Sequence, residues 1–112
     1  MSLTLYLQKH CDHCDHTEEL WSGDITHNLA DMALACGLYK VLWRPDENGF
    51  DSAGFMIDNI EFGIENLRTF PVAYEEMNPE NGWGDYDNLL NFAIDCLAAC
   101  KKYPDASVVA DR

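Results

Sequence analysis

The sequence predicts an α+β domain that is mostly helical and carries a small antiparallel sheet. Two observations lead to this fold class. Three segments repeat apolar residues at the spacing of an α-helix, and each is bounded by residues that favour helix ends. Both ends of the chain instead carry short runs rich in Leu, Tyr or Val, which are typical of strands. We therefore expect three main helices packed on a sheet made from the N-terminal strands and a C-terminal strand.

Length and charge bound the organisation of the chain and its partners. We expect the 112 residues to form one domain, with a strand–knuckle–strand unit in 1–25, a helical body in 26–103 and a C-terminal strand in 105–110. Twenty acidic residues against seven Lys and Arg give a net charge of -13. This charge repels nucleic-acid phosphates, so direct nucleic-acid binding is not expected. It favours a basic protein partner, including one that itself binds nucleic acid.

The sequence also indicates a location. No segment is apolar over the length of a membrane span, and the N-terminus lacks the basic and apolar regions of a signal peptide. Five cysteines are an odd number, and their spacing does not suggest a secreted disulfide framework. We therefore expect a cytoplasmic protein with reduced thiols and no membrane association.

The N-terminal region is expected to form two strands, over 3–8 and 18–25, with a bend at Gly23-Asp24. A tight loop over 10–16 joins them. All four histidines of the protein lie between His10 and Asn28, together with two of its cysteines. This clustering is the least random feature of the sequence.

Cys11 and Cys14 form a Cys-x-x-Cys knuckle, a spacing at which two thiolates hold one zinc ion. The pair is only half of a tetrahedral site. The candidates for the other half are His16 and His27 or, on the last helix, Cys96 and Cys100. The alternative is a solvent-exposed loop that binds no metal, with the helical cysteines packing as small hydrophobic residues.

The helical body begins near Thr26–Asn28, where both end residues are good N-caps. An apolar stripe then follows the helical period through Leu29, Met32, Ala33 and Cys36. Gly37 can end this helix in a left-handed cap, so that a second short helical piece begins at Leu38. Arg44-Pro45 ends that piece, and a turn over 46–50 follows.

The next helix is expected from Asp51 or Ser52 to about Arg68, because its apolar and acidic residues separate onto opposite faces. Pro71 breaks it, and 72–77 can add one or two helical turns. A turn-rich loop over 78–85 then leads to Asp85.

Asp85 is a good N-cap for the last helix, 86–102. The core face expected for this helix consists of Leu89, Leu90, Ala93, Ile94, Leu97 and Cys100. Pro104 ends this helix. The run 106–110 reads as a short strand that can pair with the N-terminal strand.

Polar and aromatic side chains at the ends of these elements suggest a pocket for a small anionic ligand: His27, Asn28, Arg44, Trp83 and Tyr86. His27 and Asn28 stand at an expected helix N-terminus, where backbone N–H groups suit an anion. Arg44 can bind that anion or hold a buried carboxylate. Trp83 can be a lid, or it can simply anchor its loop on the core.

The acidic face of the second main helix suggests a protein-binding surface: Phe55, Asp58, Glu61, Phe62 and Glu65. Phe55 and Phe62 lie at the edge of this face, seven residues apart. The face can be ordinary solvated surface, which charge runs usually are. It can also imitate the charge of a nucleic acid and dock into a basic groove, with the two phenylalanines as anchors.

Several segments, in the same order along the chain, resemble an uncharacterised family of small bacteriophage and prophage proteins: Ile25-Thr26-His27-Asn28-Leu29, Leu42-Trp43-Arg44-Pro45, Asn78-Pro79, Asn81-Gly82-Trp83-Gly84-Asp85-Tyr86, and Cys96 to Cys100 with Pro104-Asp105-Ala106. The resemblance covers nearly the whole chain. It implies a phage accessory protein in the bacterial cytoplasm and brings no activity with it. Family members often carry a Cys pair before the Ile-Thr-His-Asn segment, as Cys11 and Cys14 do here.

Three hypotheses for function follow. The first is a non-enzymatic binding protein with a zinc knuckle that acts on a host protein or takes up a small anionic ligand. The second is a metal-dependent hydrolase, in which Cys11, Cys14 and a histidine leave one coordination position for water and Asp24 is the base. The third is a purely structural, metal-stabilised domain. Of these, an enzyme is the less expected.

Overall fold

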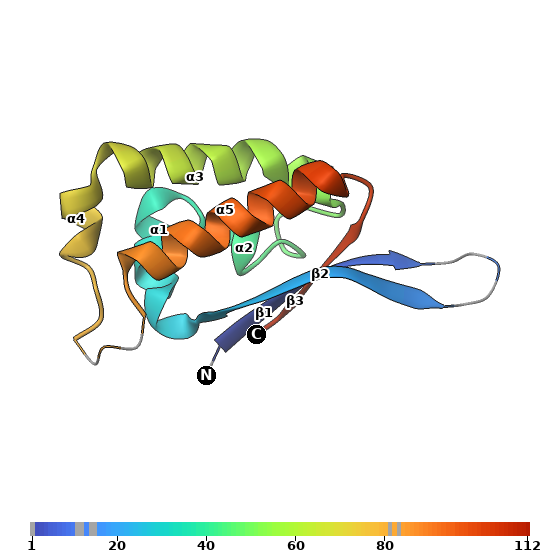
Figure 1. The fold of residues 1–112 in the computed structure, drawn as a ribbon, viewed down its shortest axis with the longest axis horizontal. Helices are drawn as coiled ribbons and strands as arrows, with labels where there is room; N and C mark the ends of the chain where they lie inside the picture. Colours follow the sequence, from blue (N-terminus) through green and yellow to red (C-terminus); the bar gives the residue numbers. More distant parts are fainter. Residues whose placement is uncertain (1, 11–12, 14–15, 81, 83) are drawn as a thin grey trace.

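The computed structural model describes residues 2–10, 13, 16–80, 82 and 84–112, and its elements follow the predicted α+β order (Figure 1). The elements are β1 (Ser2–His10), β2 (Thr17–Thr26), the 3-10 helix η1 (His27–Leu29), α1 (Ala30–Cys36), α2 (Tyr39–Leu42), the 3-10 helix η2 (Ala53–Met56), α3 (Ile57–Thr69), α4 (Pro71–Glu75), α5 (Tyr86–Lys102) and β3 (Ser107–Asp111). The Cys-x-x-Cys knuckle lies outside the described residues.

The three strands form one antiparallel sheet in the order β2-β1-β3, so the two ends of the chain pair as predicted. Leu3, Leu5 and Leu7 alternate with more exposed residues along β1 and are fully buried. They therefore turn one face of the sheet toward the helices, as the period of two in a strand requires. The pairing of β1 with β2 shifts register between Leu7 and Gln8, which marks a β-bulge.

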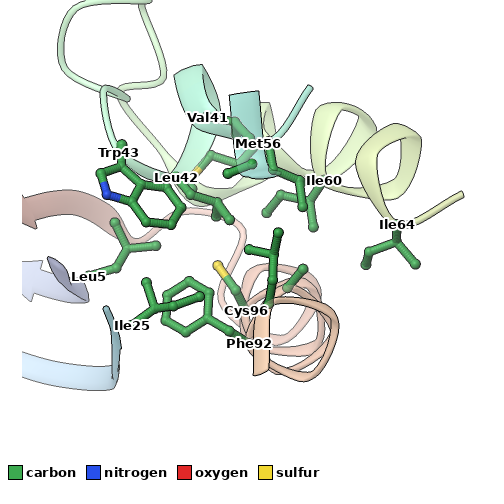
Figure 2. Packing of buried hydrophobic residues seen from close by; sticks show 14 of the residues in the cluster. Leu5, Ile25, Val41, Leu42, Trp43, Met56, Ile60, Ile64, Phe92 and Cys96 are labelled. Atoms are coloured by element: carbon green, nitrogen blue, oxygen red, sulfur yellow. The ribbon is translucent and has the colours of Figure 1, made fainter. Parts of the chain in front are cut away.

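The helices cover this leucine face of the sheet. In Figure 1, α5 runs between α3 and the sheet, while the outer ends of β1 and β2 extend beyond the helices. Figure 2 shows the core where these layers meet: Leu5 and Ile25 from the sheet face Trp43 and Phe92. Within the described part of the chain, none of the helices has the length and apolar character needed to cross a membrane.

The start of the helical body matches the sequence prediction, with one local difference. Thr26 caps the segment and accepts a hydrogen bond from the backbone N–H of Asn28 at 3.3 Å. The first turn is 3-10, however, and the α-helix begins only at Ala30. Gly37 ends α1 in the left-handed conformation with φ 91°, as predicted, and the chain continues into α2.

The second main helix starts later than predicted. Ser52 makes no side-chain cap but forms a β-bridge with Ser107. The next two backbone N–H groups donate to the C-terminal segment: Ala53 to the carbonyl of Ala106 and Gly54 to that of Pro104. The C-terminal segment thus holds the chain at Ala53 and Gly54, where 53–56 forms a 3-10 turn, and α3 begins at Ile57.

The predicted core face of α5 is partly wrong. Leu90, Ile94 and Leu97 are only half-buried, whereas Tyr86, Phe92 and Cys96 are buried. The reason is that α5 packs on α3 along one side and on β2 along another. Its buried face is therefore broader than the single apolar stripe predicted from the sequence, and it points in a different direction. The N-terminus is as predicted: Asp85 and Asn88 form a reciprocal capping box.

Candidate functional site

The structure places His27 directly after β2, where its ring contacts Trp43. The indole Nε1 of Trp43 donates a hydrogen bond of 3.1 Å to Nδ1 of His27. Trp43 is buried, and His27 is half-buried. Because Nδ1 accepts this bond, neutral His27 carries its proton on Nε2. His27 therefore has one nitrogen committed to the core and only Nε2 left for a ligand.

Arg44 follows Trp43 in the chain and is held by neighbours of its own. Tyr39 stacks on Trp43, with ring centroids 5.9 Å apart. The Nε of Arg44 donates to the Tyr39 hydroxyl at 3.2 Å, and its NH1 donates to Glu47 Oε2 at 2.9 Å. These bonds to Tyr39 and Glu47 raise the pKa of Arg44. The carboxylate that Arg44 holds is thus an exposed one, not the buried one that was considered.

Arg112 completes this cluster, and no pattern in the sequence indicated it. Its guanidinium donates to Asp46 Oδ1 at 2.8 Å and to Asp46 Oδ2 at 3.2 Å, and also to the carbonyl of Trp43 at 2.9 Å. The bond from Arg112 lowers the pKa of Asp46. Two arginines and two carboxylates, those of Asp46 and Glu47, therefore neutralise one another around the turn after α2.

The other described residues of the expected ligand pocket, Asn28 and Tyr86, do not join His27 and Arg44. Tyr86 is buried, and its hydroxyl donates to the carbonyl of Leu67 in α3 at 2.6 Å. Burial raises the pKa of Tyr86, so it serves as a neutral packing contact between α5 and α3. Asn28 is exposed, and Trp83 lies outside the described residues. Among the four pocket residues that the structure describes, it thus links His27 and Arg44, through Tyr39 and Trp43.

The expected metal ligands are also separated. Cys11 and Cys14 lie outside the described residues, but Cys11 is bonded directly to His10, the last residue of β1. His16 precedes the first residue of β2, whereas His27 follows its last. Ten strand residues at ~3.3 Å each place the two histidines about 30 Å apart. One zinc ion at the His10 end cannot take His27 as a ligand.

The alternative ligands Cys96 and Cys100 are core residues. Both are fully buried, and their side chains are hydrogen-bonded to each other across one turn of α5. That bond and burial raise the pKa of Cys96. In the part of the chain that the structure describes, no three His, Cys, Asp or Glu side chains come together as a metal-binding group.

The hydrolase hypothesis also loses its expected base. Asp24 lies on β2 opposite Thr4, whose hydroxyl donates a hydrogen bond to its carboxylate. Seven residues of extended strand separate Asp24 from Thr17, which corresponds to about 23 Å. Its carboxylate is thus far from any metal held beside His10, and it cannot activate water there.

The acidic face of α3, by contrast, is exposed as a unit. Phe55 and Phe62 expose 67% and 60% of their surface, although each is a large apolar side chain. Asp58, Glu61 and Glu65 are exposed as well. We call these five residues, of which Phe55 belongs to η2 and the others to α3, the α3 face. Helix geometry places Phe62 four residues after Asp58 and three before Glu65, so their side chains are neighbours.

The two edges of the α3 face are fixed by its contacts. Glu61 forms an ion pair of 3.2 Å with Lys101 of α5, in which both side chains are about half exposed. Phe62 lies beside Gly37 at the end of α1. Other exposed apolar side chains, which the sequence analysis did not single out, are Leu34, Phe70, Val72, Met77 and Val109.

Comparison with known proteins gives no family for this chain. It matches no protein-family model, no curated protein and no solved structure. The resemblance to phage proteins therefore stays a prediction, and function has to be argued from the residues themselves.

Proposed function

We propose that the protein is a non-enzymatic binding protein that docks its α3 face on a basic surface of a partner protein. The observation that carries this proposal is the exposure of Phe55 and Phe62 beside three carboxylates. Isolated exposed apolar residues are common on any protein. Two phenylalanines more than half exposed, Phe55 in η2 and Phe62 in α3, are a large apolar area to leave in water.

The negative charge beside the phenylalanines favours a basic partner surface. The carboxylates of Asp58, Glu61 and Glu65 lie on the same helix as Phe62, and Lys101 pairs with only one of these three. Exposed ion pairs of this kind contribute about 0–1 kcal/mol, so Glu61 can exchange Lys101 for a partner cation at little cost. Aromatic anchors with an acidic rim fit a partner surface that offers an apolar pocket with Lys or Arg around it. With the phage resemblance, we propose a bacterial host protein as this partner, including one that itself binds nucleic acid.

The contacts around Arg44 do not favour the alternative of a small anionic ligand. A free guanidinium would be needed to attract the anion, whereas Arg44 and Arg112 both pair with carboxylates. Tyr86 is directed into the helix packing. A docking face is therefore the better-supported function.

A zinc ion in the knuckle is part of the proposal, as a structural element. The pairing of His10 with Thr17 closes a loop that begins at Cys11 and contains Cys14. Since His27 is about 30 Å away, the remaining ligands would come from His10, His13 and His16. Protein purified without chelator or histidine tag should contain one equivalent of zinc by elemental mass spectrometry. Metal-free protein that melts at the same temperature as the purified protein would rule this out.

Photo-crosslinking tests the docking face directly. A benzoylphenylalanine placed at Phe62 should crosslink a bacterial protein in cells, whereas the same group at Val72 on α4 should not. Val72 is a matched control because it is equally exposed, at 66%, but lies outside the α3 face. The crosslinked protein is then identified by mass spectrometry and purified.

Binding of that purified partner gives the quantitative test. The double change Phe55→Ser and Phe62→Ser should weaken binding by about 10-fold or more, because anchors of this kind contribute at least 1–2 kcal/mol each. Val72→Ser should leave the affinity unchanged, and added salt should weaken binding through the acidic rim. Equal affinity of the double variant and the wild type would refute the α3 face as the docking site.

A further inference from the structure

A second surface, at the outer edge of the sheet, has features that the α3 face lacks. A groove of about 520 Å³ runs between β2 and α5. Six consecutive residues, Trp21 to Thr26, form its strand wall, and Asn88, Phe92 and Asp95 form its helix wall. Gly84 closes one end. The volume lies within the range of ligand-binding sites, about 300–1,000 Å³.

The strand wall of this groove is an unpaired sheet edge. The sheet order β2-β1-β3 leaves β2 hydrogen-bonded on one side only. Every second residue of such an edge strand directs its N–H and C=O away from the sheet, where they can pair with another chain. From Trp21 to Thr26 the pairing with β1 is regular, and the register shift falls beyond Trp21. This edge segment contains neither Lys nor Pro, the residues that commonly block such edges.

Two aromatic rings cover Gly23 in the strand wall of the groove. Gly23 has no side chain there, and a Cβ would meet the Trp21 ring at 2.8 Å and the Phe92 ring at 3.1 Å. The Trp21 and Phe92 rings are tilted at 57°, with centroids 6.1 Å apart. The two rings therefore lie over Gly23, tilted relative to one another, and form an aromatic part of the groove lining that an extended chain can contact.

The rim of the groove is acidic. Asp24 and Asp95 stand on opposite walls, both exposed, and none of the ten described residues that line the groove is basic. An extended segment lying between them would place alternate side chains toward the two carboxylates. Lysine or arginine at those positions would be attracted, while acidic side chains would be repelled.

From this geometry we propose that the groove binds an extended, lysine- or arginine-containing peptide segment of a partner protein, which adds to the sheet as a strand beside β2. The strand wall of six residues corresponds to about 17 Å of extended chain, so the bound segment has five or six residues. Main-chain hydrogen bonds would supply affinity, and Asp24 and Asp95 would supply selectivity. A second copy of this chain does not fit, because it would bring another net charge of -13 to the same edge.

This proposal does not depend on the α3 face, since none of the five residues of that face lines the groove. The probe is a synthetic peptide of alternating Lys and Val. Two control peptides replace its Lys residues with Glu, or its central Val with Pro. The Lys–Val peptide should bind and shift the backbone amide NMR signals of β2 and α5. The Glu peptide should fail through repulsion, and the Pro peptide should bind more weakly because it lacks one N–H donor.

Charge reversal on the protein separates this site from general attraction to an acidic molecule. Asp95→Lys should lower the affinity for the Lys–Val peptide by about three- to tenfold. Asp105→Lys, which makes the same change in net charge beyond the end of α5, should lower it much less. Phe62→Ser should have no effect, so failure of the proposed α3 docking would leave this result untouched.

Three outcomes would overturn the proposal. The first is an equal loss of affinity for the Lys–Val peptide in Asp95→Lys and Asp105→Lys. The second is equal affinity for the Pro peptide and the Lys–Val peptide. The third is a set of shifted backbone amide NMR signals that does not include β2. A fourth would also refute it: concentration-dependent dimers in sedimentation experiments that Asp95→Lys changes, because the groove would then serve a second copy of the chain.

Discussion

Trp43 and His27 are joined by a hydrogen bond of 3.1 Å, from the indole Nε1 to the imidazole Nδ1. The bond ties the residue that follows β2 to the end of α2. It satisfies the only polar atom in the side chain of Trp43, a residue that is 2% exposed. A histidine that looked like a metal ligand in the sequence thus acts as an acceptor for a core side chain.

Removing His27 should therefore destabilise the protein. His27→Ala leaves the buried indole N–H of Trp43 without its partner, which costs about 1–3 kcal/mol of unfolding free energy. Urea unfolding followed by circular dichroism measures the loss. Asn28→Ala is the control, because Asn28 is the next residue and its side chain is exposed.

A glutamine at position 27 distinguishes the hydrogen bond from simple packing. The side-chain oxygen of His27→Gln can accept from Trp43, so this variant should recover part of the stability that His27→Ala loses. If His27→Ala and Asn28→Ala unfold at the same urea concentration, the bond contributes nothing to stability.

The packing of α3 against Leu38 depends on the absence of a side chain at Gly63. A Cβ built on Gly63 would lie 2.3 Å from Cγ and Cδ2 of Leu38, which is itself fully buried. Gly63→Ala should destabilise the protein by about 1–3 kcal/mol through this clash, although alanine favours a helix over glycine by about 1 kcal/mol.

Asn59→Ala, on an exposed position one turn earlier in α3, is the matched control and should change stability little. Adding Leu38→Ala to Gly63→Ala should cost less than Leu38→Ala costs in the wild type, because the space left by leucine receives the new methyl group. If the losses of unfolding free energy caused by Gly63→Ala and Leu38→Ala simply add, α3 moves away from Leu38 in Gly63→Ala and no clash is present.

The fold was predictable because it follows from local patterns. The Leu- and Tyr-rich run over 3–8 predicted the strand that carries the buried Leu3, Leu5 and Leu7, and Gly37 and Asp85 marked a helix end and a helix start. Patterns failed where a distant segment decides the local structure. The delayed start of α3 is one case, because the N–H groups of Ala53 and Gly54 bond to the chain beyond α5.

The candidate site was less predictable for the same reason. Arg112 and Asp46 are 66 residues apart, and no periodicity in the sequence relates them. The histidine cluster suggested one site because His16 and His27 are close in sequence, but a strand between them makes them distant in space. The residues of the α3 face could be proposed from the sequence because they lie within one short stretch, 55–65, and their role as a docking surface stays a prediction.

The ion pair of Asp46 with Arg112 should make stability depend on pH in the acid range. Arg112 lowers the pKa of Asp46 in the folded protein. The stabilisation is then complete above the unfolded-state pKa, about 3.9, and is lost as the pH falls through the lower folded-state pKa. Asp46→Asn should therefore be less stable than wild type near pH 6, and the difference should shrink below about pH 4.

Urea midpoints measured across this pH range test the sign of the effect. Asp105→Asn removes the same charge elsewhere on the surface and serves as the control. A difference between Asp46→Asn and wild type that grows as the pH falls would contradict the ion pair as the source of the stabilisation.

The buried thiols should be unreactive while the protein is folded. Burial raises the pKa of Cys36 to about 11, and Cys36, Cys96 and Cys100 are all inaccessible to solvent. Alkylation needs an accessible thiolate, and at about pH 8 the folded protein offers none at these three positions. Iodoacetamide should modify them only in denaturant, as peptide mapping by mass spectrometry would show.

The raised pKa of Cys36 should also make the stability of the protein fall as the pH rises, whereas the lowered pKa of Asp46 makes it fall as the pH decreases. Because the folded-state pKa of Cys36 lies above its ordinary value of 9.0, the associated stability is complete below pH 9.0 and is lost as the pH rises toward about 11. Cys36→Ala removes this titrating group, so its stability should fall less steeply over that interval.

Rapid alkylation of Cys36 in the folded protein at about pH 8 would show that α1 opens without global unfolding.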